Sequence, residues 1–545
     1  MRKSLGLLVA LLLSSPVAAR QTLVVAPGGS VVSTIANAPD GAVVEIQSNE
    51  SYVGTLAWTD KSLVVRAAPG FEPRIVGSPS SPAIRLTPGL VADTAGTFEG
   101  LVFEGSPTSE AIELLGSLSN GDLVEASFNG CRIEGSSSVV GNGSTGVARL
   151  TLSNCELTED LSFTAIGQSR YEAVIDDSEI GGDVTLGASA FSSGDLTLNE
   201  VSIQGGWTLA AGGMTTGDVK LFDSSIGDGI LVDLLGSANW QQESRRVRVV
   251  GGTFLSAVTP AFFLGVFESS TFESGLSGAQ TGIETTGSPT SVVARFVNPT
   301  ISDFPLGILP LDTGTSVTNG LFHRNAVDIA TPQASALSFA NCVIPDGTFT
   351  GQNGNVAGAA ALDALFRPAN SSSPVDVGDS TAQDLGFLDF YGNPRVQDGD
   401  GDGTPTVNAG AVETVRCQGP FFAVASSRLG WPANPDVLSW SGPPALGRVL
   451  ELSVDHTTFL PNAVGDFLIV SSFPNNFFLP QNGTLCLDLS RIIGTQLRLA
   501  GERFEIQLPR GCPWLAQPVI LQAVSLGPAG GIRFTNAVDC QLGFF

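Results

Sequence analysis

The stretches Phe128-Asn129-Gly130-Cys131-Arg132-Ile133 and Leu152-Ser153-Asn154-Cys155-Glu156-Leu157 decide the fold, because their pattern recurs along the middle of the chain. The pattern is an apolar residue, any residue, a small or amide residue, a small residue, any residue and an apolar residue. Further copies begin at Ile175, Leu198, Leu221, Val249, Phe267, Phe296, Val317 and Phe339. The fourth residue of each copy serves as an anchor, at positions 131, 155, 178, 201, 224, 252, 270, 299, 320 and 342. Nine steps cover 342 − 131 = 211 residues, or 23.4 residues per step.

A period of this length indicates a solenoid, in which each unit buries its apolar residues only by stacking on the next unit. The step is too long for a hexapeptide helix and lacks the Leu and Asn pattern of leucine-rich repeats. It suits one coil of a parallel β-helix with three short strands and three turns. The residue before the anchor is Asn at positions 154, 298, 319 and 341. Stacked amides at one turn predict a polar ladder that fixes the register of the coils.

The segments on either side of the repeat resemble known secreted proteins. Residues 25–29, 38–46 and 51–54 are similar to the opening of secreted β-helix proteins, and residues 374–379, 389–396 and 408–413 resemble the choice-of-anchor type Q domain. Asn408, Ala409 and Val412 depart from the usual Asp, Ile and Tyr of its last motif. With the repeat, these motifs resemble the pectin-lyase-like superfamily. That resemblance implies an all-β, right-handed parallel β-helix and secretion.

The N-terminus predicts export. Residues 1–19 contain Arg2 and Lys3, an apolar run from Leu7 to Leu13 and small residues before Ala19, as in a secretory signal peptide. No later stretch approaches the roughly 20 apolar residues that a membrane span needs. The formal charge of −26 disfavours nucleic acid and anionic membranes, which attract clustered cations. We expect a secreted, extracellular or cell-surface protein without a membrane span, with the β-helix over residues 20–415.

The composition changes after Glu413, where aromatic residues and prolines become more frequent. Residues 450–454, 467–470, 485–489 and 504–508 mostly alternate between apolar and polar, as sandwich strands do. We expect a small β-sandwich over residues 416–545 that binds glycans, anchors the protein or caps the β-helix. Its four cysteines allow three connectivities. The favoured pairs are Cys417 with Cys540 and Cys486 with Cys512. Cys131 and Cys155 share the anchor column and form either a disulfide or a stack of core thiols.

A candidate binding face follows from the residues that precede each anchor. Alternation places positions two apart on one face of a strand. Six positions before the anchor the coils carry Glu125, Arg149, Glu172, Asp195, Asp218 and Arg246, and four positions before it they carry Ser127, Thr151, Val174, Thr197, Lys220 and Arg248. The positions between are apolar and are expected to point inward: Ala126, Leu150, Ala173, Leu196, Val219 and Val247.

Three carboxylates of this face, Glu172, Asp195 and Asp218, should stack about 4.8 Å apart. Neighbours then repel by about 0.9 kcal/mol in water and about 3.5 kcal/mol at an effective dielectric of 20, so nearby cations are expected. One reading is a solvated salt-bridge ladder completed by Arg149, Arg246 and Lys220. The other is a saccharide or calcium groove in which Lys220, Arg246 or Arg248 meets an acidic sugar. In β-helix polysaccharide lyases a basic side chain commonly abstracts a proton beside a uronate carboxylate.

Four other features are weaker candidates for chemistry. The pair Asp176-Asp177 resembles the paired aspartates of polygalacturonase-like hydrolases, but Asp177 falls at the ladder position and no Gly-His-Gly motif is present. His323 is expected in a turn, and His456 has no partner motif. Asp398, Asp400 and Asp402 match the first half of an EF-hand-type loop, which suggests Ca²⁺, although Ala409 stands where the closing Glu would be.

The residues favour a non-catalytic extracellular surface or carbohydrate-binding protein. The alternatives are a polysaccharide lyase or glycosidase acting on acidic polysaccharide, and a structural or adhesion protein of the cell envelope. No catalytic residue is identified by sequence.

Overall fold

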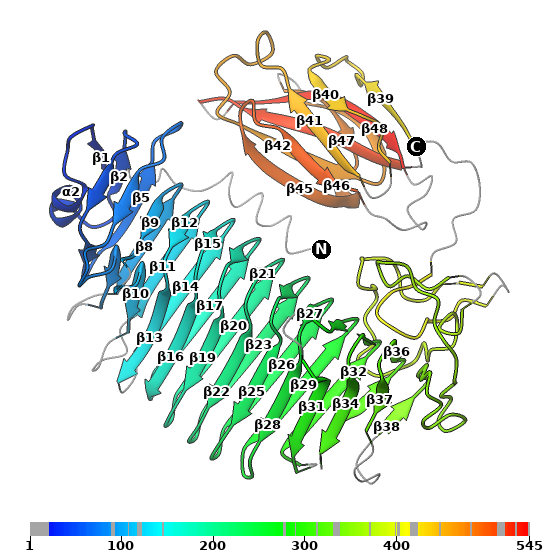
Figure 1. Ribbon diagram of the computed structural model, residues 1–545. Coiled ribbons are helices and arrows are strands. Elements are labelled where there is room, and N and C mark those ends of the chain that lie inside the picture. The colour runs from blue at the N-terminus through cyan, green and yellow to red at the C-terminus, as the bar shows by residue number, and fades with distance from the viewer. Residues whose placement is uncertain are drawn as a thin grey trace. The chain divides into compact units, whose positions relative to one another are not determined.

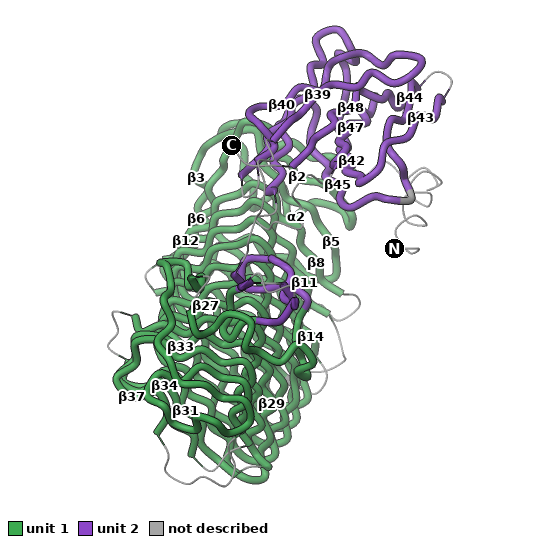
Figure 2. Tube along the Cα trace, turned by 90° about the vertical axis from the view of Figure 1, so that its right-hand side faces the viewer, with its two compact units in different colours: residues 1–386, 408–412 green, residues 387–407, 413–545 purple. Residues whose placement is uncertain are grey.

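The structure is a computed structural model (Figure 1). It describes residues 21–88, 93–106, 108–116, 123–143, 146–275, 279–288, 290–311, 314–330, 338–369, 372–397, 399–400, 404–414, 423–445, 448–479, 482–508, 518–528 and 531–542. The predicted signal peptide therefore lies outside the described residues. The chain divides into two compact units, residues 1–386 with 408–412 and residues 387–407 with 413–545 (Figure 2).

The first unit is a right-handed parallel β-helix of about 13 coils, as predicted. Each complete coil adds one strand to each of three parallel sheets, which we name A, B and C. Sheet A contains β1 (Thr22–Val25), β2 (Val43–Ile46), β5 (Ser62–Ala67), β8 (Thr94–Glu99), β11 (Leu123–Asn129), β14 (Val147–Ser153), β17 (Arg170–Asp176), β20 (Ser193–Asn199), β23 (Thr216–Phe222), β26 (Asn239–Arg245), β29 (Phe262–Glu268), β32 (Val292–Val297), β35 (Ser316–Thr318) and β38 (Ser338–Ala340).

Sheets B and C follow the same stacking order, and Figure 1 shows the coils side by side. Sheet B contains β3 (Ser51–Val53), β6 (Arg74–Val76), β9 (Val102–Glu104), β12 (Arg132–Glu134), β15 (Glu156–Leu157), β18 (Glu179–Ile180), β21 (Ser202–Ile203), β24 (Ser225–Ile226), β27 (Arg248–Val250), β30 (Thr271–Glu273), β33 (Thr300–Ser302) and β36 (Leu321–His323). Sheet C contains β4 (Leu56–Trp58), β7 (Ile84–Leu86), β10 (Ile112–Leu115), β13 (Ser137–Gly143), β16 (Leu161–Gly167), β19 (Val184–Ala188), β22 (Trp207–Ala211), β25 (Ile230–Leu234), β28 (Thr253–Ala257), β31 (Thr281–Gly287), β34 (Leu306–Leu311) and β37 (Val327–Ile329).

The core consists of side chains that stack in register from coil to coil. Phe98 lies on Phe128 with ring centroids 4.8 Å apart, and Phe267 lies on Phe296 at 4.9 Å. The first five predicted inward positions, from Ala126 to Val219, are buried as expected. Because every coil shares its apolar face with two neighbours, this core is continuous along the unit. A short helix, α2 (Val31–Asn37), precedes β2 near the N-terminal end of the stack.

The corner between sheets A and B explains the amides of the repeat. One residue of each of these corners has a left-handed backbone, with φ of 52° at Asn154, 46° at Asp177, 53° at Asn298 and 56° at Asn319. Short amide and carboxylate side chains tolerate this conformation better than other non-glycine residues do. The predicted ladder forms between Asn319 and Asn298, whose side chains are hydrogen-bonded at 3.3 Å. Asn154, by contrast, is exposed.

The register corrects one predicted anchor. Glu179, Ser202, Ser225, Arg248 and Thr271 are successive partners in sheet B, so the corner recurs every 23 residues from position 178 to position 270. The anchor of the sixth coil is therefore residue 247, and the predicted anchor at residue 252 is wrong. The copy was misplaced because Ser244 occupies the first position of the repeat, which is apolar in the other copies. Ser244 is buried and accepts a hydrogen bond from Gln242 at 3.1 Å, a polar pair inside the apolar core.

The second unit contains the predicted β-sandwich. Its five-stranded antiparallel sheet is formed by β39 (Val424–Arg428), β48 (Ile532–Gln541), β47 (Pro518–Leu526), β42 (Gly465–Ser471) and β45 (Ile492–Leu499). One face packs on the sheet of β40 (Leu438–Ser441), β41 (Val449–Val454) and β46 (Phe504–Gln507). The other face packs on the hairpin of β43 (Pro474–Leu479) and β44 (Gly483–Leu487), and a short 3-10 helix, η1 (Leu489–Arg491), precedes β45. β47 is buried on both faces as a result.

The described cysteines are free thiols in the structure: Cys131, Cys155, Cys342, Cys486 and Cys540. Of the two alternatives for Cys131 and Cys155, the structure therefore contains the thiol stack. A hydrogen bond with Cys155 and burial raise the pKa of Cys131, which keeps this thiol protonated. The two bridges predicted in the sandwich find no support at Cys486 and Cys540, and their predicted partners, Cys417 and Cys512, lie outside the described residues.

Candidate functional site

The outer face of sheet A contains the predicted carboxylate row. Glu125 pairs in register with Arg149, which pairs with Glu172, and the row continues through Asp195 to Asp218. These side chains project outward because the alternate residues of the same strands are buried. The stacking of Glu172, Asp195 and Asp218 is thus confirmed. Their role in binding stays a prediction.

Arginines neutralise the first part of this row. Arg149 forms ion pairs with Glu172 at 2.7 Å and with Glu125 at 3.5 Å. Its hydrogen bond to Glu172 raises the pKa of the guanidinium. Arg170 contacts Glu172 at 3.3 Å and also pairs with Asp195. From Glu125 to Asp195 the outer face of sheet A is therefore a salt-bridge ladder, in which arginines offset the repulsion between stacked carboxylates. Each exposed pair contributes little stability, about 0–1 kcal/mol.

Arg246 and Arg248 do not belong to this face, which corrects the predicted set of substrate-binding residues. Arg246 occupies the corner between sheets A and B, where its φ is 55°, and binds Asp223 of the previous coil at 2.5 and 2.6 Å. Arg248 begins β27 in sheet B and binds Glu273 at 2.8 and 2.9 Å. The five-residue error in the anchor caused both assignments. The residues in register with Asp218 and Lys220 are Gln241 and Glu243.

Two adjoining hollows lie over sheet A at the Asp195 end of the ladder. A hollow of about 330 Å³ is lined by Arg170, Ser193, Asp195, Thr216, Gly217, Asp218, Asn239 and Gln241. A second hollow of about 410 Å³ shares Asp218 and Gln241 with the first. Its other lining residues are Val219, Lys220, Gln242, Glu243, Arg245, Leu264, Val266, Glu268 and Asp384. We call the two hollows together the sheet A groove.

Asp218 lines both hollows and Lys220 lines the second, and the two residues are two positions apart on the exposed face of β23. Within the described part of the chain, neither side chain has an ion pair or a hydrogen bond. Glu243 on the next strand is engaged by Arg245 at 2.5 Å. The groove therefore offers an open carboxylate and an open ammonium group, both of which can bind a polar ligand.

A segment from the end of the first unit closes the groove at β29. Residues 376–386, which we call the strap, cross the outer face of sheet A. The Asp379 backbone N–H donates to the Asn319 side chain at 2.6 Å, and Arg295 forms an ion pair with Asp384 at 3.1 Å. Gly386 lies against the Glu268 carboxylate so closely that a Cβ there would be 2.5 Å from Oε1. Glu268 is consequently 1% exposed, although it belongs to the outward-facing set of β29.

Several groove residues were missed by the sequence reasoning. Gln241 and Glu243 follow directly from a strict 23-residue step, which was the signal available in the sequence. Asp384 and the burial of Glu268 have no such signal, because the strap is distant in the sequence and follows no repeat. One oxygen of the Glu268 carboxylate has no hydrogen-bond partner among the described residues.

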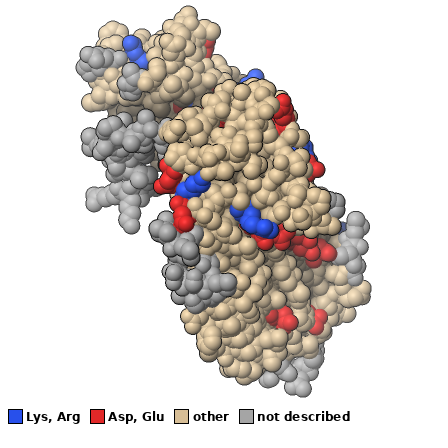
Figure 3. Space-filling model, turned by 90° about the vertical axis from the view of Figure 1, so that its left-hand side faces the viewer, with Lys and Arg blue, Asp and Glu red and all other residues tan. Residues whose placement is uncertain are grey.

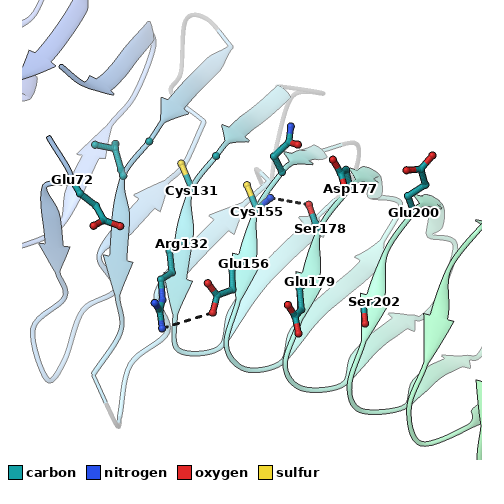
Figure 4. A pocket seen from close by; sticks show the side chains of 14 residues that line it. Glu72, Cys131, Arg132, Cys155, Glu156, Asp177, Ser178, Glu179, Glu200 and Ser202 are labelled. Carbon is teal, nitrogen blue, oxygen red and sulfur yellow. Dashed lines mark hydrogen bonds and ion pairs between the residues drawn. The ribbon is translucent and has the colours of Figure 1, made fainter. Parts of the chain in front are cut away.

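A third hollow, of about 640 Å³, lies along the corner between sheets A and B (Figure 4). Glu156, Asp177, Glu179 and Glu200 project around it, and Arg132 reaches Glu156 at 3.7 Å. Asp177 occupies the left-handed corner position, as its predicted place in the ladder requires. No group of three or more metal-ligating side chains is found among the described residues.

On the face shown in Figure 3, Lys and Arg atoms lie beside Asp and Glu atoms and most of the surface is uncharged.

The two histidines and the described part of the predicted calcium loop do not line the sheet A groove. His323 ends β36 rather than lying in a turn, and burial and Arg324 lower the pKa of its imidazole. His456, for which the sequence offered no partner, is hydrogen-bonded to the buried Asp466 at 2.8 Å. The calcium loop stays a prediction, since Asp398 and Asp402 lie outside the described residues and Asp400 is exposed.

The strand topology is that of a right-handed parallel β-helix. No family model and no curated protein matches the chain. Among solved structures, the chain is similar to pectate lyase Pel9A at 11% identity and a TM-score of 0.27, covering 73% of this chain and 97% of that one. No described helix is long and apolar enough to cross a membrane.

Proposed function

We propose that the protein is an extracellular carbohydrate-binding protein and that the sheet A groove holds the glycan. The observation that supports this most strongly is that Asp218, which lines both hollows, and Lys220, which lines the second, have no side-chain partner among the described residues. The carboxylates on the neighbouring strands, Asp195 and Glu243, are by contrast neutralised by arginines. Sugar hydroxyls both donate and accept hydrogen bonds, so a carboxylate and an ammonium side by side suit them. Gln241 adds an amide that does both.

The charge balance of the groove favours a neutral, hydroxyl-rich chain over a polyanion. Carboxylates outnumber cations in it, and the whole chain has a formal charge of −26. A uronate polymer would be repelled by this field unless cations bound with it. The carboxylates of the groove are Asp195, Asp218, Glu243, Glu268 and Asp384, and its cations are Arg170, Lys220 and Arg245.

The test is affinity electrophoresis and calorimetry of residues 20–545 against neutral xylan, galactan and glucan and acidic polygalacturonate and alginate. The double variant Asp218→Asn/Lys220→Ala should bind the recognised neutral polymer about 10- to 100-fold more weakly, because two charge-assisted hydrogen bonds are lost. Arg248→Ala removes a charge from sheet B and is the matched control, with unchanged binding.

Each outcome of this experiment has a defined meaning. Absence of binding to every polymer, or equal losses in the groove variant and the Arg248→Ala control, would refute a glycan site in the groove.

A parallel series in calcium and in chelator tests the predicted role of Asp398, Asp400 and Asp402. If that loop binds Ca²⁺, chelation lowers the thermal midpoint of the wild-type chain, and Asp400→Ala removes the effect of calcium.

A further inference from the structure

The two ends of the sheet A groove differ. At the ladder end the outer face of sheet A continues over β17, β14 and β11, whose outward-facing residues are exposed or half-buried. At the other end the strap crosses the face. Asp384 of the strap lines the second hollow and pairs with Arg295 of β32, and Gly386 lies against Glu268 of β29. The groove is therefore open at the ladder and closed at the strap.

The floor of the groove also changes toward the closed end. Successive strands place Asp218, Gln241 and Leu264 in one column of the outer face. The adjacent column passes from Lys220 to Val266 over the same strands. Leu264 and Val266 face outward, and both are half-buried and line the second hollow. A polar floor thus gives way to an apolar one directly before the strap, and such a floor suits the apolar face of a sugar ring.

One hydrogen-bond acceptor at the closed end lacks a donor. Glu268 lines the second hollow, yet it is only 1% exposed. One of its carboxylate oxygens accepts from the Ser269 hydroxyl, and the other has no hydrogen-bond partner among the described residues. A buried acceptor without a donor costs free energy, which a hydroxyl group of a ligand would recover. Because so little of Glu268 is open, only a small group at the tip of a ligand can meet it.

We propose, on the basis of the glycan site proposed above, that the sheet A groove binds the end of a neutral glycan chain, with the last sugar unit against the strap. The ring of this unit packs on Leu264 and Val266, and one of its hydroxyl groups donates to Glu268. The chain then leaves the groove past Lys220 toward the ladder. An internal segment cannot occupy this place, because the strap stands where the next sugar unit would continue.

Calorimetry of residues 20–545 against chains of two lengths tests end recognition. Xylan, galactan and glucan are each hydrolysed to a short fraction and to a fraction about ten times longer. If the protein binds chain ends, the short fraction should offer about tenfold more binding sites per gram, because it contains about tenfold more ends. A protein that binds internal segments finds the same number of sites per gram in both. Borohydride reduction of the chains then separates the two termini, since lost binding assigns the reducing end and retained binding the non-reducing end.

Two variants test the closed end itself. Glu268→Gln should bind chain ends about tenfold more weakly, because a hydrogen bond to a charged acceptor is lost. Glu273→Gln is its matched control, since Glu273 is a half-buried carboxylate of sheet B, outside the groove, and its variant should bind like the wild type. Asn319→Ala removes a side chain that holds the strap, so it should bind equal numbers of sites per gram in short and long fractions. Asn154→Ala should keep the difference seen in the wild type.

The outcomes separate end recognition from glycan binding as such. Equal numbers of sites per gram in the short and long fractions of the wild type would overturn end recognition and leave a glycan site in the groove. If no polymer binds at all, the glycan site fails and end recognition fails with it. A preference for ends that persists in Asn319→Ala, when hydrogen exchange shows the strap open, also overturns the proposal. Unchanged affinity in Glu268→Gln would remove Glu268 from the terminal site.

Discussion

Replacing Asn319 with alanine should release the strap from the β-helix. The Asn319 side chain is fully buried at a corner between sheets A and B. Its Oδ1 accepts from the Asp379 backbone at 2.6 Å, and its Nδ2 donates to the Asp379 carbonyl at 3.1 Å and to Asn298 at 3.3 Å. Alanine removes all three hydrogen bonds and leaves a methyl group in a left-handed backbone position, where φ is 56°.

The expected loss in the free energy of unfolding is about 4 kcal/mol. Each hydrogen bond contributes about 1 kcal/mol net, and alanine in the left-handed region costs about 1 kcal/mol more than asparagine. Asn154→Ala is the matched control. Asn154 has a φ of 52°, but it is exposed and its side chain has no hydrogen bond with the described residues, so its variant should lose only about 1 kcal/mol.

Two measurements separate these contributions. Chemical unfolding, followed by circular dichroism, gives the stability of each variant. Hydrogen exchange, read by mass spectrometry for residues 376–386, should show loss of protection in Asn319→Ala and wild-type protection in Asn154→Ala. If both variants lose the same stability and the strap stays protected, the amide network contributes nothing and the reasoning fails.

Three further predictions concern the core and its ionisable groups. Gly217→Ala should cost at least about 3 kcal/mol in thermal or chemical unfolding, because a Cβ would lie 2.4 Å from the Trp240 ring, whereas Gly212→Ala, with open space, should be nearly neutral. Burial raises the pKa of Glu110, so its contribution to stability is full below the unfolded carboxyl pKa of ~4.3 and is lost as pH rises through the folded value. Glu110→Gln should therefore gain stability relative to the wild type between pH 4 and pH 7, and an unchanged difference would contradict this. Burial raises the pKa of Cys342 to about 12, so a thiol reagent at pH 8 should modify it in guanidinium but not in the native protein.

The sequence by itself was sufficient for the architecture. A coil cannot bury its apolar residues alone, so a repeat near 23 residues with inward positions such as Ala126 and Val219 leads directly to stacked parallel strands. Because equivalent residues of successive coils stack, a column of outward-facing residues in the sequence also predicts neighbours in space. Glu172, Asp195 and Asp218 were therefore placed together correctly. Alternation in residues 450–508 likewise indicated the sandwich, since period-two burial is local information.

Only the tertiary structure showed where a coil departs from the repeat and which segment outside the repeat packs against the β-helix. Ser244 and Gln242 form a polar pair in the core, and because such a pair removes the apolar signal, the register of Arg246 and Arg248 was misread. The strap closes the groove over Glu268 through contacts with residues about 60 to 120 positions away in the sequence, and no periodicity carries that information. A repeat determines which residues stack on one another, because each coil buries its apolar residues against the neighbouring coils. Contacts made once, between unrelated segments, depend on the folded surfaces themselves.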